Sequence, residues 1–447
     1  MLLSQIQALH VLVKNSRKFS LIVLSSFLFF LISLVIKGAA YAEETVGAID
    51  SGDTAWIMVS TALVLLMTPG LALFYAGMAR RKNVLGTIMH SFFILCLISV
   101  QWVVLGYSLS FGSDVGGITG ALNYFGLINV GVEANGTIPH VVFMMFQGMF
   151  AIITVALITG AFAERMKFSA MIIFSLLWAT LIYDPLCHWV WGGGWLGELG
   201  VLDFAGGVVV HISAGISALV CAIVIGKRRG FPKVHMPPHN LTLTVLGMGL
   251  LWFGWFGFNG GSALAANGTA GMAIVTTNTA AAVGTLTWVF LEWWRSGKPT
   301  VLGAVSGAVA GLGAITPAAG FVGPSSAIII GFVSGILCYI AVVKLKQRFA
   351  YDDTLDVFGI HGISGIWGTI SVGIFASVGA KGILFGDASQ LYKQIIGVLV
   401  TVVFCGVGTY ILLKITGAIV GGLRVSAEDE AIGLDLSQHG ERGYTMN

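Results

Sequence analysis

The sequence is poor in charged side chains. Only 10% of its 447 residues are Asp, Glu, Lys or Arg, whereas 56% are hydrophobic. A soluble domain needs roughly a quarter of charged residues to cover its surface. The composition therefore excludes a soluble globular protein and indicates an integral membrane protein.

Several motifs that would indicate other chemistry are also absent. The five cysteines are scattered, with no C-x-x-C pair and no His/Cys spacing suited to zinc, so neither a disulfide framework nor a metal site is predicted. We interpret them as small buried hydrophobic residues. The apolar segments contain no HExxH, no GxSxG and no paired carboxylates, which argues against an intramembrane enzyme and predicts no cofactor.

The first 42 residues differ from the rest. They hold four Lys/Arg and no acidic residue, and Lys14, Arg17 and Lys18 precede the apolar run "FSLIVLSSFLFFLISLVI". With Ala40-Tyr41-Ala42 in an A-x-A arrangement, this pattern predicts a cleaved signal peptide over residues 1–42; an uncleaved anchor helix is the alternative. Cleavage leaves 19 basic and 20 acidic residues, a net charge of −1, so no basic surface for nucleic acid is expected.

Apolar segments of about 20 residues fill the chain after residue 50, each long enough to span a bilayer. Strand-like alternation is absent, so we predict an all-α integral membrane protein and not a barrel. Eleven transmembrane helices are predicted, at about 54–79, 85–111, 139–163, 168–186, 204–226, 241–261, 272–294, 300–316, 324–345, 357–378 and 392–416.

Basic residues alternate with the helix count. The connections after odd-numbered helices contain "ARRKN", "ERMK", "GKRRGFPK", "RSGK" and "KLKQR", which hold 14 Lys/Arg, whereas the first four connections after even-numbered helices hold none. Only Lys381 and Lys393, around the fifth, break the pattern. Because positively charged loops stay in the cytoplasm, the N-terminus is predicted outside and the C-terminus inside.

Two segments resemble one another. "DFAGGVVVHISAGISA" begins at Asp203 in helix five, and "DVFGIHGISGIWG" begins at Asp356 in helix ten. Each has an Asp, a Gly-rich turn, a His and an I-S-x-G-I-like run. An offset of five helices makes them cross the membrane in opposite directions, which predicts an inverted repeat of five plus five helices with an extra C-terminal helix.

The repeat relates His211 to His361. At 1.5 Å per residue, His211 is expected roughly 12 Å below the outer end of its helix and His361 roughly 8 Å above the inner end of its own. In a core of about 30 Å, a gap of about 10 Å remains, so the sequence permits contact without requiring it. Because ionisable residues inside a membrane mark transport pathways, both histidines are predicted to be functional, whereas the other histidines lie nearer helix ends and loops.

No Lys, Arg, Asp or Glu lies deep inside a predicted span. A bare cation would therefore face a desolvation cost on the order of 20 kcal/mol, whereas a small neutral molecule would not. A neutral imidazole offers one N–H donor and one bare nitrogen, which suits a small guest that both donates and accepts.

The predicted outer mouth suits the charged form of such a guest. Trp191, in the outer connection "HWVWGGGW", could hold a cation by cation–π attraction, and Ser262 could accept a hydrogen bond from it. Phe258, four residues deeper, would form an apolar gate. An ordinary aromatic belt at the membrane interface is the alternative. Asp203 is predicted to cap helix five and to favour a nearby cation, whereas Asp184 is expected outside with no assigned role.

Eight motifs together resemble the ammonium transporter family, most closely its bacterial members, over about residues 50–447. They are "FQGMFAIITVALITGAFAERMKFSA", "HWVWGGGWL", "LDFAGGVVVHI", "GKRRGF", "WFGFNGGS", "ITPAAGF", "DVFGIHGISGIWG" and "GLRVSAEDEAIGLDLSQHGERGY". The site residues that this resemblance implies are Phe150, Trp191 and Ser262 for outer ammonium recruitment, Phe146 and Phe258 for the gate, His211 and His361 for the pore, and Asp203 as the structural aspartate.

The resemblance further implies a homotrimer in the bacterial inner membrane, in contact with lipid and with one pore per subunit. The transporter domain would span residues 43–416, and residues 417–447 would form a cytoplasmic regulatory tail that works with PII signalling proteins. Ammonium and methylammonium would be the substrates, with NH4+ deprotonated outside and NH3 passing the histidines. An electroneutral Rhesus-type NH3/CO2 channel and a sensor acting through a partner protein are the alternatives. Ser426 and Asp429 have the spacing of a helix capping box, which suggests an ordered tail.

Overall fold

The computed structural model describes residues 48–444, which belong to one compact unit spanning Thr45–Asn447. The predicted signal peptide, residues 1–42, lies outside the described residues. Within residues 48–444, ten helical segments are long and apolar enough to cross a membrane, and an eleventh apolar helix, Val301–Ile315, is shorter. The helical membrane fold is confirmed, and each of the eleven predicted spans corresponds to one of these helical segments.

The first five spans are continuous or composite helices. They are α2 (Ser51–Met78); α3 (Val84–Gln101) with η2 (Trp102–Gly106) and α4 (Tyr107–Phe111); α5 (His140–Phe162); α6 (Phe168–Trp178) with η4 (Ala179–Tyr183) and α7 (Asp184–Trp191); and η5 (Gly207–Ile212) with α9 (Ser213–Ile225). The next six are α10 (Leu241–Gly261), α11 (Gly268–Ser296), α12 (Val301–Ile315), α13 (Pro324–Ile340) with η6 (Ala341–Leu345) and α14 (Lys346–Phe349), η7 (Phe358–Gly362) with α15 (Ile363–Phe375), and α16 (Ala388–Val420).

Short elements fill the connections. Between the second and third spans, β1 (Asp114–Val115) pairs antiparallel with β2 (Thr119–Gly120), and β3 (Ala134–Asn135) pairs with β4 (Ile138–Pro139). The remaining short helices are η1 (Arg81–Asn83), η3 (Leu122–Leu127), α8 (Trp195–Leu199), η8 (Ile383–Phe385), α17 (Ala427–Ile432) and α18 (Leu434–His439).

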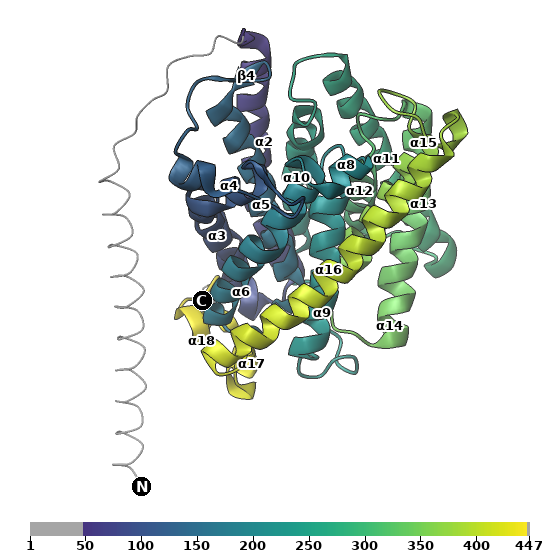
Figure 1. The fold of residues 1–447 in the computed structure, drawn as a ribbon. Helices are drawn as coiled ribbons and strands as arrows, with labels where there is room; N and C mark the ends of the chain where they lie inside the picture. Colours follow the sequence, from purple (N-terminus) through teal and green to yellow (C-terminus); the bar gives the residue numbers. More distant parts are fainter. Residues whose placement is uncertain (1–47, 445–447) are drawn as a thin grey trace. The chain divides into compact units, whose positions relative to one another are not determined.

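The eleventh span, α16, runs obliquely across the other helices (Figure 1). Its 33 residues make a helix about 50 Å long. A bilayer core is only about 30 Å thick, so a helix of this length must tilt to keep its apolar side chains in lipid.

The inverted repeat is visible in the first turns of the fifth and tenth spans. Both begin as π-helix, in η5 and η7, and each histidine lies in that segment. Gly215, four residues after His211, packs so closely on Gly362 that a Cβ could not fit. Its counterpart Gly365, four residues after His361, would place a Cβ 2.8 Å from the Cβ of His211. Each helix thus crosses the other at equivalent positions.

In this repeat, Asp203 corresponds to Asp353 and not, as expected, to Asp356, three residues later. Asp203 lies eight residues before His211, and the residue eight before His361 is Asp353, not Asp356. Asp353 Oδ2 accepts a hydrogen bond from the backbone N–H of Phe358 at 2.8 Å, five residues on, just as Asp203 Oδ2 accepts from the residue five after it. Asp356 instead corresponds to Gly206: both have positive φ, 61° and 119°.

The connections that follow odd-numbered spans lie beside the C-terminal tail, on one side of the unit. Arg228 bonds Glu164 and Asp352, at 3.4 and 2.8 Å, and Arg80 bonds Glu164 at 2.6 Å. Although burial alone would raise the pKa of Asp352, the Arg228 guanidinium holds it below its usual value. This pairing stabilises the connections against one another.

The tail is ordered and docked on these connections. Glu430 accepts from Arg424 at 2.6 Å and from the backbone N–H of Arg229 at 2.6 Å. The expected capping box is present, with Ser426 and Asp429 bonded reciprocally at the start of α17. The tail follows the eleventh span and contacts the connections after the first, third and fifth spans. All of these segments therefore lie on the same side of the helices, as the predicted number of spans requires.

Candidate functional site

A hollow of about 410 Å³ opens beside the end of α7. Among its lining residues are Phe150, Trp191, Asp203 and Ser262. Trp191 is the last residue of α7 and its indole N–H donates to the backbone oxygen of Asp203 at 2.8 Å. The fourth span therefore extends five residues beyond its expected end, and Trp191 stands on a helix and not in a connection.

Three aromatic rings, Trp191, Phe150 and Phe258, pack one against the next from the wall of this hollow inward. Phe150 meets Trp191 edge-on, with ring centroids 5.8 Å apart, and its ring lies against Phe258 at 4.4 Å. Phe150 lines the hollow, whereas Phe258 lines the cavity beneath it. The Phe150–Phe258 pair therefore separates the two spaces.

The structure packs Phe258 against Phe150, whereas the resemblance implied Phe146 and Phe258 as the gate residues. Phe146 is fully buried one turn before Phe150 on α5 and packs on Phe150 with ring centroids 5.1 Å apart. It lines neither space, because that turn of α5 faces Gly261 in α10, where a Cβ would lie 2.8 Å from the Phe146 ring. Phe150, assigned above to recruitment alone, is the ring that covers Phe258.

Ser262 lies at the C-terminal end of α10. Its hydroxyl donates to the backbone oxygen of Phe258 at 2.7 Å. The hydroxyl proton is thereby committed, and the oxygen lone pairs remain as acceptors. Ser262 can therefore accept a hydrogen bond from a cation in the hollow.

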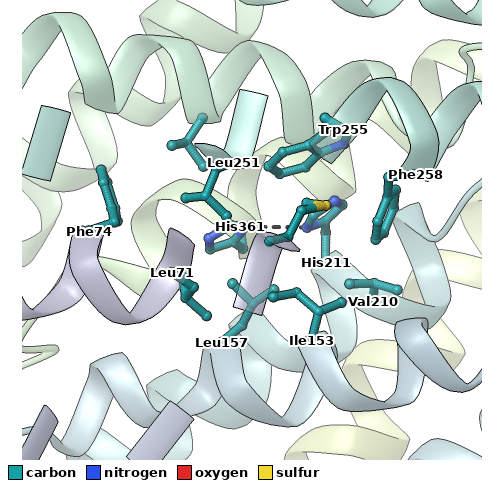
Figure 2. Close-up of a pocket in the computed structure, with 12 residues that line it drawn as sticks. Leu71, Phe74, Ile153, Leu157, Val210, His211, Leu251, Trp255, Phe258 and His361 are labelled. Carbon is teal, nitrogen blue, oxygen red and sulfur yellow. Dashed lines mark hydrogen bonds between the residues drawn. The ribbon is translucent and has the colours of Figure 1, made fainter. Parts of the chain in front are cut away.

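A narrow cavity continues below Phe258 and contains both histidines. Figure 2 shows their rings facing each other between Phe258 at one end and Phe74 at the other. Apart from the histidines and the Trp255 indole, the wall is formed by Leu, Ile, Val, Met and Phe side chains. The volume open to the centre of a water-sized molecule is about 10 Å³. This is enough for about one water-sized molecule.

The two imidazoles are bonded to each other. Nδ1 of His211 lies 3.2 Å from Nδ1 of His361, and the rings are nearly parallel at 10°. In such a pair of neutral rings, one Nδ1–H donates the hydrogen bond and the other, bare Nδ1 accepts it. The outward Nε2 atoms must then differ, one being a bare acceptor and the other an N–H donor. Nε2 of His211 has no partner among the described residues.

The expected gap of about 10 Å between the histidines was wrong, because both helices begin inside the membrane. His211 is four residues after Gly207 and His361 three after Phe358, where their helices start. The 14 residues that follow each histidine to Ile225 and Phe375 extend about 21 Å. Two antiparallel helices that meet at their histidines would together span about 42 Å, which is more than the thickness of the bilayer core. Each helix therefore already crosses its half of the core after the histidine, and the few residues before the histidine start within the core.

Asp203 explains why the fifth span can start in a buried place. Its Oδ1 accepts from the N–H groups of Gly206 and Gly207 at 2.8 and 2.6 Å, and its Oδ2 from Val208 and Val209 at 2.7 and 3.1 Å. These are the four donors that a helix start leaves unpaired. The cap predicted from the sequence is confirmed, and both carboxylate oxygens are engaged in it.

Two residues of the site were not recognised in the sequence. Trp255 stacks on His211, with centroids 5.5 Å apart and planes at 17°, and its N–H donates to Thr316 at 2.9 Å. Gln147 lines the outer hollow. Trp255 belongs to the "WFGFNGGS" motif, three residues before Phe258, but the helical spacing was applied only to Phe258 and Ser262. Nothing in the sequence distinguishes Gln147.

The expectation that Asp184 lies outside was wrong. Its side chain is fully buried between the second and fourth spans, and Oδ2 accepts from the Gln101 amide at 2.6 Å. The extension of the fourth span to Trp191 places Asp184 at the start of α7, inside the span and not at its end. Within residues 48–444, no group of three or more His, Cys, Asp or Glu side chains is placed to hold a metal ion.

An inverted repeat whose interrupted helices bring a polar pair to the centre of an apolar path defines a multi-pass helical membrane transporter. The chain belongs to the ammonium transporter family, because the model of the Ammonium Transporter Family matches residues 55–444. It is 53% identical to an ammonium transporter of Bacillus subtilis over 401 residues, which cover 88% of this chain and 98% of that protein.

Solved structures of related proteins are also similar to this chain. The crystal structure of Candida albicans Mep2 has a TM-score of 0.81 and 37% identity, covering 89% of this chain and 91% of that chain. A sensor Amt protein has a TM-score of 0.81 and 30% identity, covering 87% of this chain and 98% of that chain.

Proposed function

We propose that the protein takes up ammonium by binding NH4+ at the outer hollow, removing its proton and passing NH3 through the histidine-lined cavity. Methylammonium, a slightly larger amine, is expected to follow the same path. The observation that carries the proposal is the step from a wide hollow of about 410 Å³ to an apolar cavity of about 10 Å³ across one pair of phenylalanine rings.

Recruitment outside would rest on Trp191, Phe150 and Ser262. The two rings meet edge-on at 5.8 Å and offer aromatic surface to one space, where cation–π attraction contributes about 0.5–2 kcal/mol. The Ser262 oxygen supplies an acceptor for one N–H of the cation. Asp203 adds negative charge beside the hollow, although its oxygens are occupied by backbone donors.

The Phe150–Phe258 pair would exclude ions. A cation moving from the hollow into the cavity would lose its water and find no carboxylate there, at a cost of several kcal/mol even after relaxation. Ammonia carries no net charge and avoids most of this cost. The proton must therefore leave at or above the rings.

Inside the cavity, the two histidines would replace water. Their bonded Nδ1 atoms leave one Nε2 acceptor and one Nε2–H donor, which match the N–H groups and the lone pair of ammonia. The roles exchange when the bare Nε2 of one ring takes up a proton, the bridging proton moves to the Nδ1 of the other ring, and that ring releases its Nε2 proton. The pair can therefore also relay a proton. Trp255 would hold the His211 ring in plane through its stacking contact.

Replacing Trp191 with leucine is expected to weaken ammonium capture, because the indole supplies the cation–π surface. Loss of about 1.4 kcal/mol would raise the apparent KM about tenfold at little change in maximal rate. Uptake into proteoliposomes over a range of ammonium concentrations measures both parameters. An unchanged KM would contradict recruitment at this ring.

A current measurement tests whether the proton crosses as well. If the histidine pair relays the proton, an ammonium pulse should produce inward current in proteoliposomes that carry the wild-type protein. An electroneutral channel of the Rhesus type would carry ammonia without current. Empty liposomes given the same pulse serve as the control.

A sensor function is the second candidate, supported by the likeness to the sensor Amt protein. In this function, a signal would pass from the docked tail to a bound partner. We further propose transport without enzymatic turnover, a homotrimer with one pore per subunit, and regulation by a PII-type protein at the tail. The transporter domain would be residues 43–416, in the inner membrane, with the C-terminus in the cytoplasm as the basic connections predict.

A further inference from the structure

A third histidine, outside the pore, has an unusual environment. His188 lies on α7, one turn before Trp191, and is completely buried. Its Nδ1 is 3.0 Å from the backbone oxygen of Ser110, and its Nε2 is 2.9 Å from Oδ1 of Asp114. Both neighbours are hydrogen-bond acceptors with no proton to give, since Asp114 also accepts from the backbone N–H of Gly117 at 2.9 Å.

A neutral imidazole cannot satisfy both contacts. It carries one N–H, so its other nitrogen would place a lone pair against an acceptor oxygen. With both nitrogens protonated, the ring donates twice, and the bond to Asp114 becomes charge-assisted, which makes it shorter and stronger than a neutral one. The bond from His188 is the main reason that the pKa of Asp114 lies below its usual value.

The other charged and titratable groups near His188 do not offer it a competing bond. Asp184, one turn earlier on α7, is bonded to Gln101. Cys187 is adjacent in the chain and buried. Asp114 on the β1–β2 hairpin is therefore the anion that pairs with this ring.

His140 provides an internal comparison. Its Nδ1 faces Oε1 of Glu133 at 2.9 Å, whereas its Nε2 faces the hydroxyl of Tyr107. A hydroxyl can donate as well as accept, so a neutral His140 satisfies both of its contacts. The same kind of carboxylate partner therefore does not demand a charge at His140.

His188 and its neighbours fasten the β1–β2 hairpin to the end of α7. The Trp189 indole donates to the backbone oxygen of Ile118 at 2.7 Å, and the backbone N–H of Trp195 donates to Gly117 at 3.3 Å. The N–H groups of Gly192 and Gly194 return to the backbone oxygen of His188, at 3.0 and 2.9 Å. These bonds surround Trp191, whose ring faces the hollow on the same helical turn.

We propose that His188 is a positioning residue with both ring nitrogens protonated. Its two hydrogen bonds, to Ser110 and Asp114, clamp the β1–β2 hairpin onto α7 and thereby hold Trp191 over the outer hollow. The consequence for transport rests on the proposed function, because it supposes that Trp191 recruits ammonium. The protonation state of His188 does not depend on the proposed function.

Nitrogen-15 NMR of histidine-labelled protein tests the charge directly. At pH 7.5 the wild type should show one histidine with both ring nitrogens protonated, and this signal should be lost in Asp114→Asn, whose amide N–H can donate to a bare Nε2. A wild-type spectrum in which every buried histidine has a bare nitrogen would overturn the proposal. The measurement needs no transport activity.

Uptake kinetics test the clamp. Asp114→Ala should raise the apparent KM for ammonium at least about fivefold and leave the maximal rate within about twofold, since about 1 kcal/mol corresponds to a factor of five. Asp114→Asn, which keeps a neutral bond, should fall between Asp114→Ala and wild type. Glu133→Ala is the matched control and should leave KM unchanged, because β3 and β4 do not carry the His188 contact.

The outcomes separate the two hypotheses. A wild-type KM in Asp114→Ala, while Trp191→Leu raises it, would overturn the clamp and leave recruitment intact. If Trp191→Leu itself leaves KM unchanged, recruitment fails, but a doubly protonated His188 would still stand.

Discussion

Replacing His361 with alanine should reduce the maximal rate of ammonium uptake about tenfold and leave the apparent KM within about twofold. The substitution removes one half of the bonded imidazole pair and leaves Nδ1 of His211 without its partner. A buried polar atom left unpaired costs about 1–3 kcal/mol, and ammonia crossing the cavity loses a hydrogen bond of similar size. A barrier raised by about 1.4 kcal/mol corresponds to the tenfold loss.

Initial uptake rates in proteoliposomes measure this effect, with His211→Ala as the companion variant. KM should change little because neither histidine lines the outer hollow. His235→Ala, in the exposed connection after the fifth span, is the control and should transport like wild type. Wild-type rates in both His211→Ala and His361→Ala would rule out any role of the pair in conduction.

Hydrophobicity and the alternation of loop charge were enough to predict the number and order of the spans. The helix ends were less accurate where the backbone departs from a regular α-helix. Five spans contain a π-helical turn, including those that hold Trp102–Gly106 and the two pore histidines. Such a turn adds a residue without changing the hydrophobicity of the segment, so no pattern in the sequence reveals it.

Two further expectations differ from the structure, one because of how the sequences of the two repeats were aligned and the other because of tertiary packing. Asp356 was chosen as the partner of Asp203 because the letters around the two histidines align best from it, whereas the backbone repeats from Asp353. Phe146 and Phe150 are one turn apart on the same helix, so both are compatible with a position near Phe258. The neighbouring helix α10 decides between them, and that packing is a tertiary property.

Trp255 shows which part of the site could be predicted from the sequence. A residue three positions before Phe258 lies on the same face of a helix, and Phe258 was already placed in the path. The plane of the indole, however, depends on its bond to Thr316, the residue that follows α12. The sequence can therefore suggest that Trp255 lines the cavity but not that it stacks on His211.

Replacing Asp203 with alanine should prevent the protein from accumulating in folded form, or lower its melting temperature sharply. The variant leaves four buried backbone N–H groups without acceptors, and each unpaired group costs about 1–3 kcal/mol. Even if relaxation removes half of this cost, the loss is on the order of 5 kcal/mol, comparable with the entire stability of many proteins. Tryptophan fluorescence during heating in detergent, with size-exclusion chromatography, measures the effect.

The inverted repeat supplies the matched comparison, because Asp353 occupies the equivalent position with fewer bonds. Its Oδ1 has no partner among the described residues and Oδ2 accepts from Phe358, so Asp353→Ala should cost less than Asp203→Ala; equal melting temperatures would refute the assignment of stability to the bonded donors. Asp203→Asn then separates the two roles of the carboxylate. The amide keeps one acceptor oxygen and should fold better than alanine, but it removes the negative charge beside Trp191. A folded Asp203→Asn protein with a raised KM would assign the charge to ammonium capture, whereas a wild-type KM would confine Asp203 to the start of the fifth span.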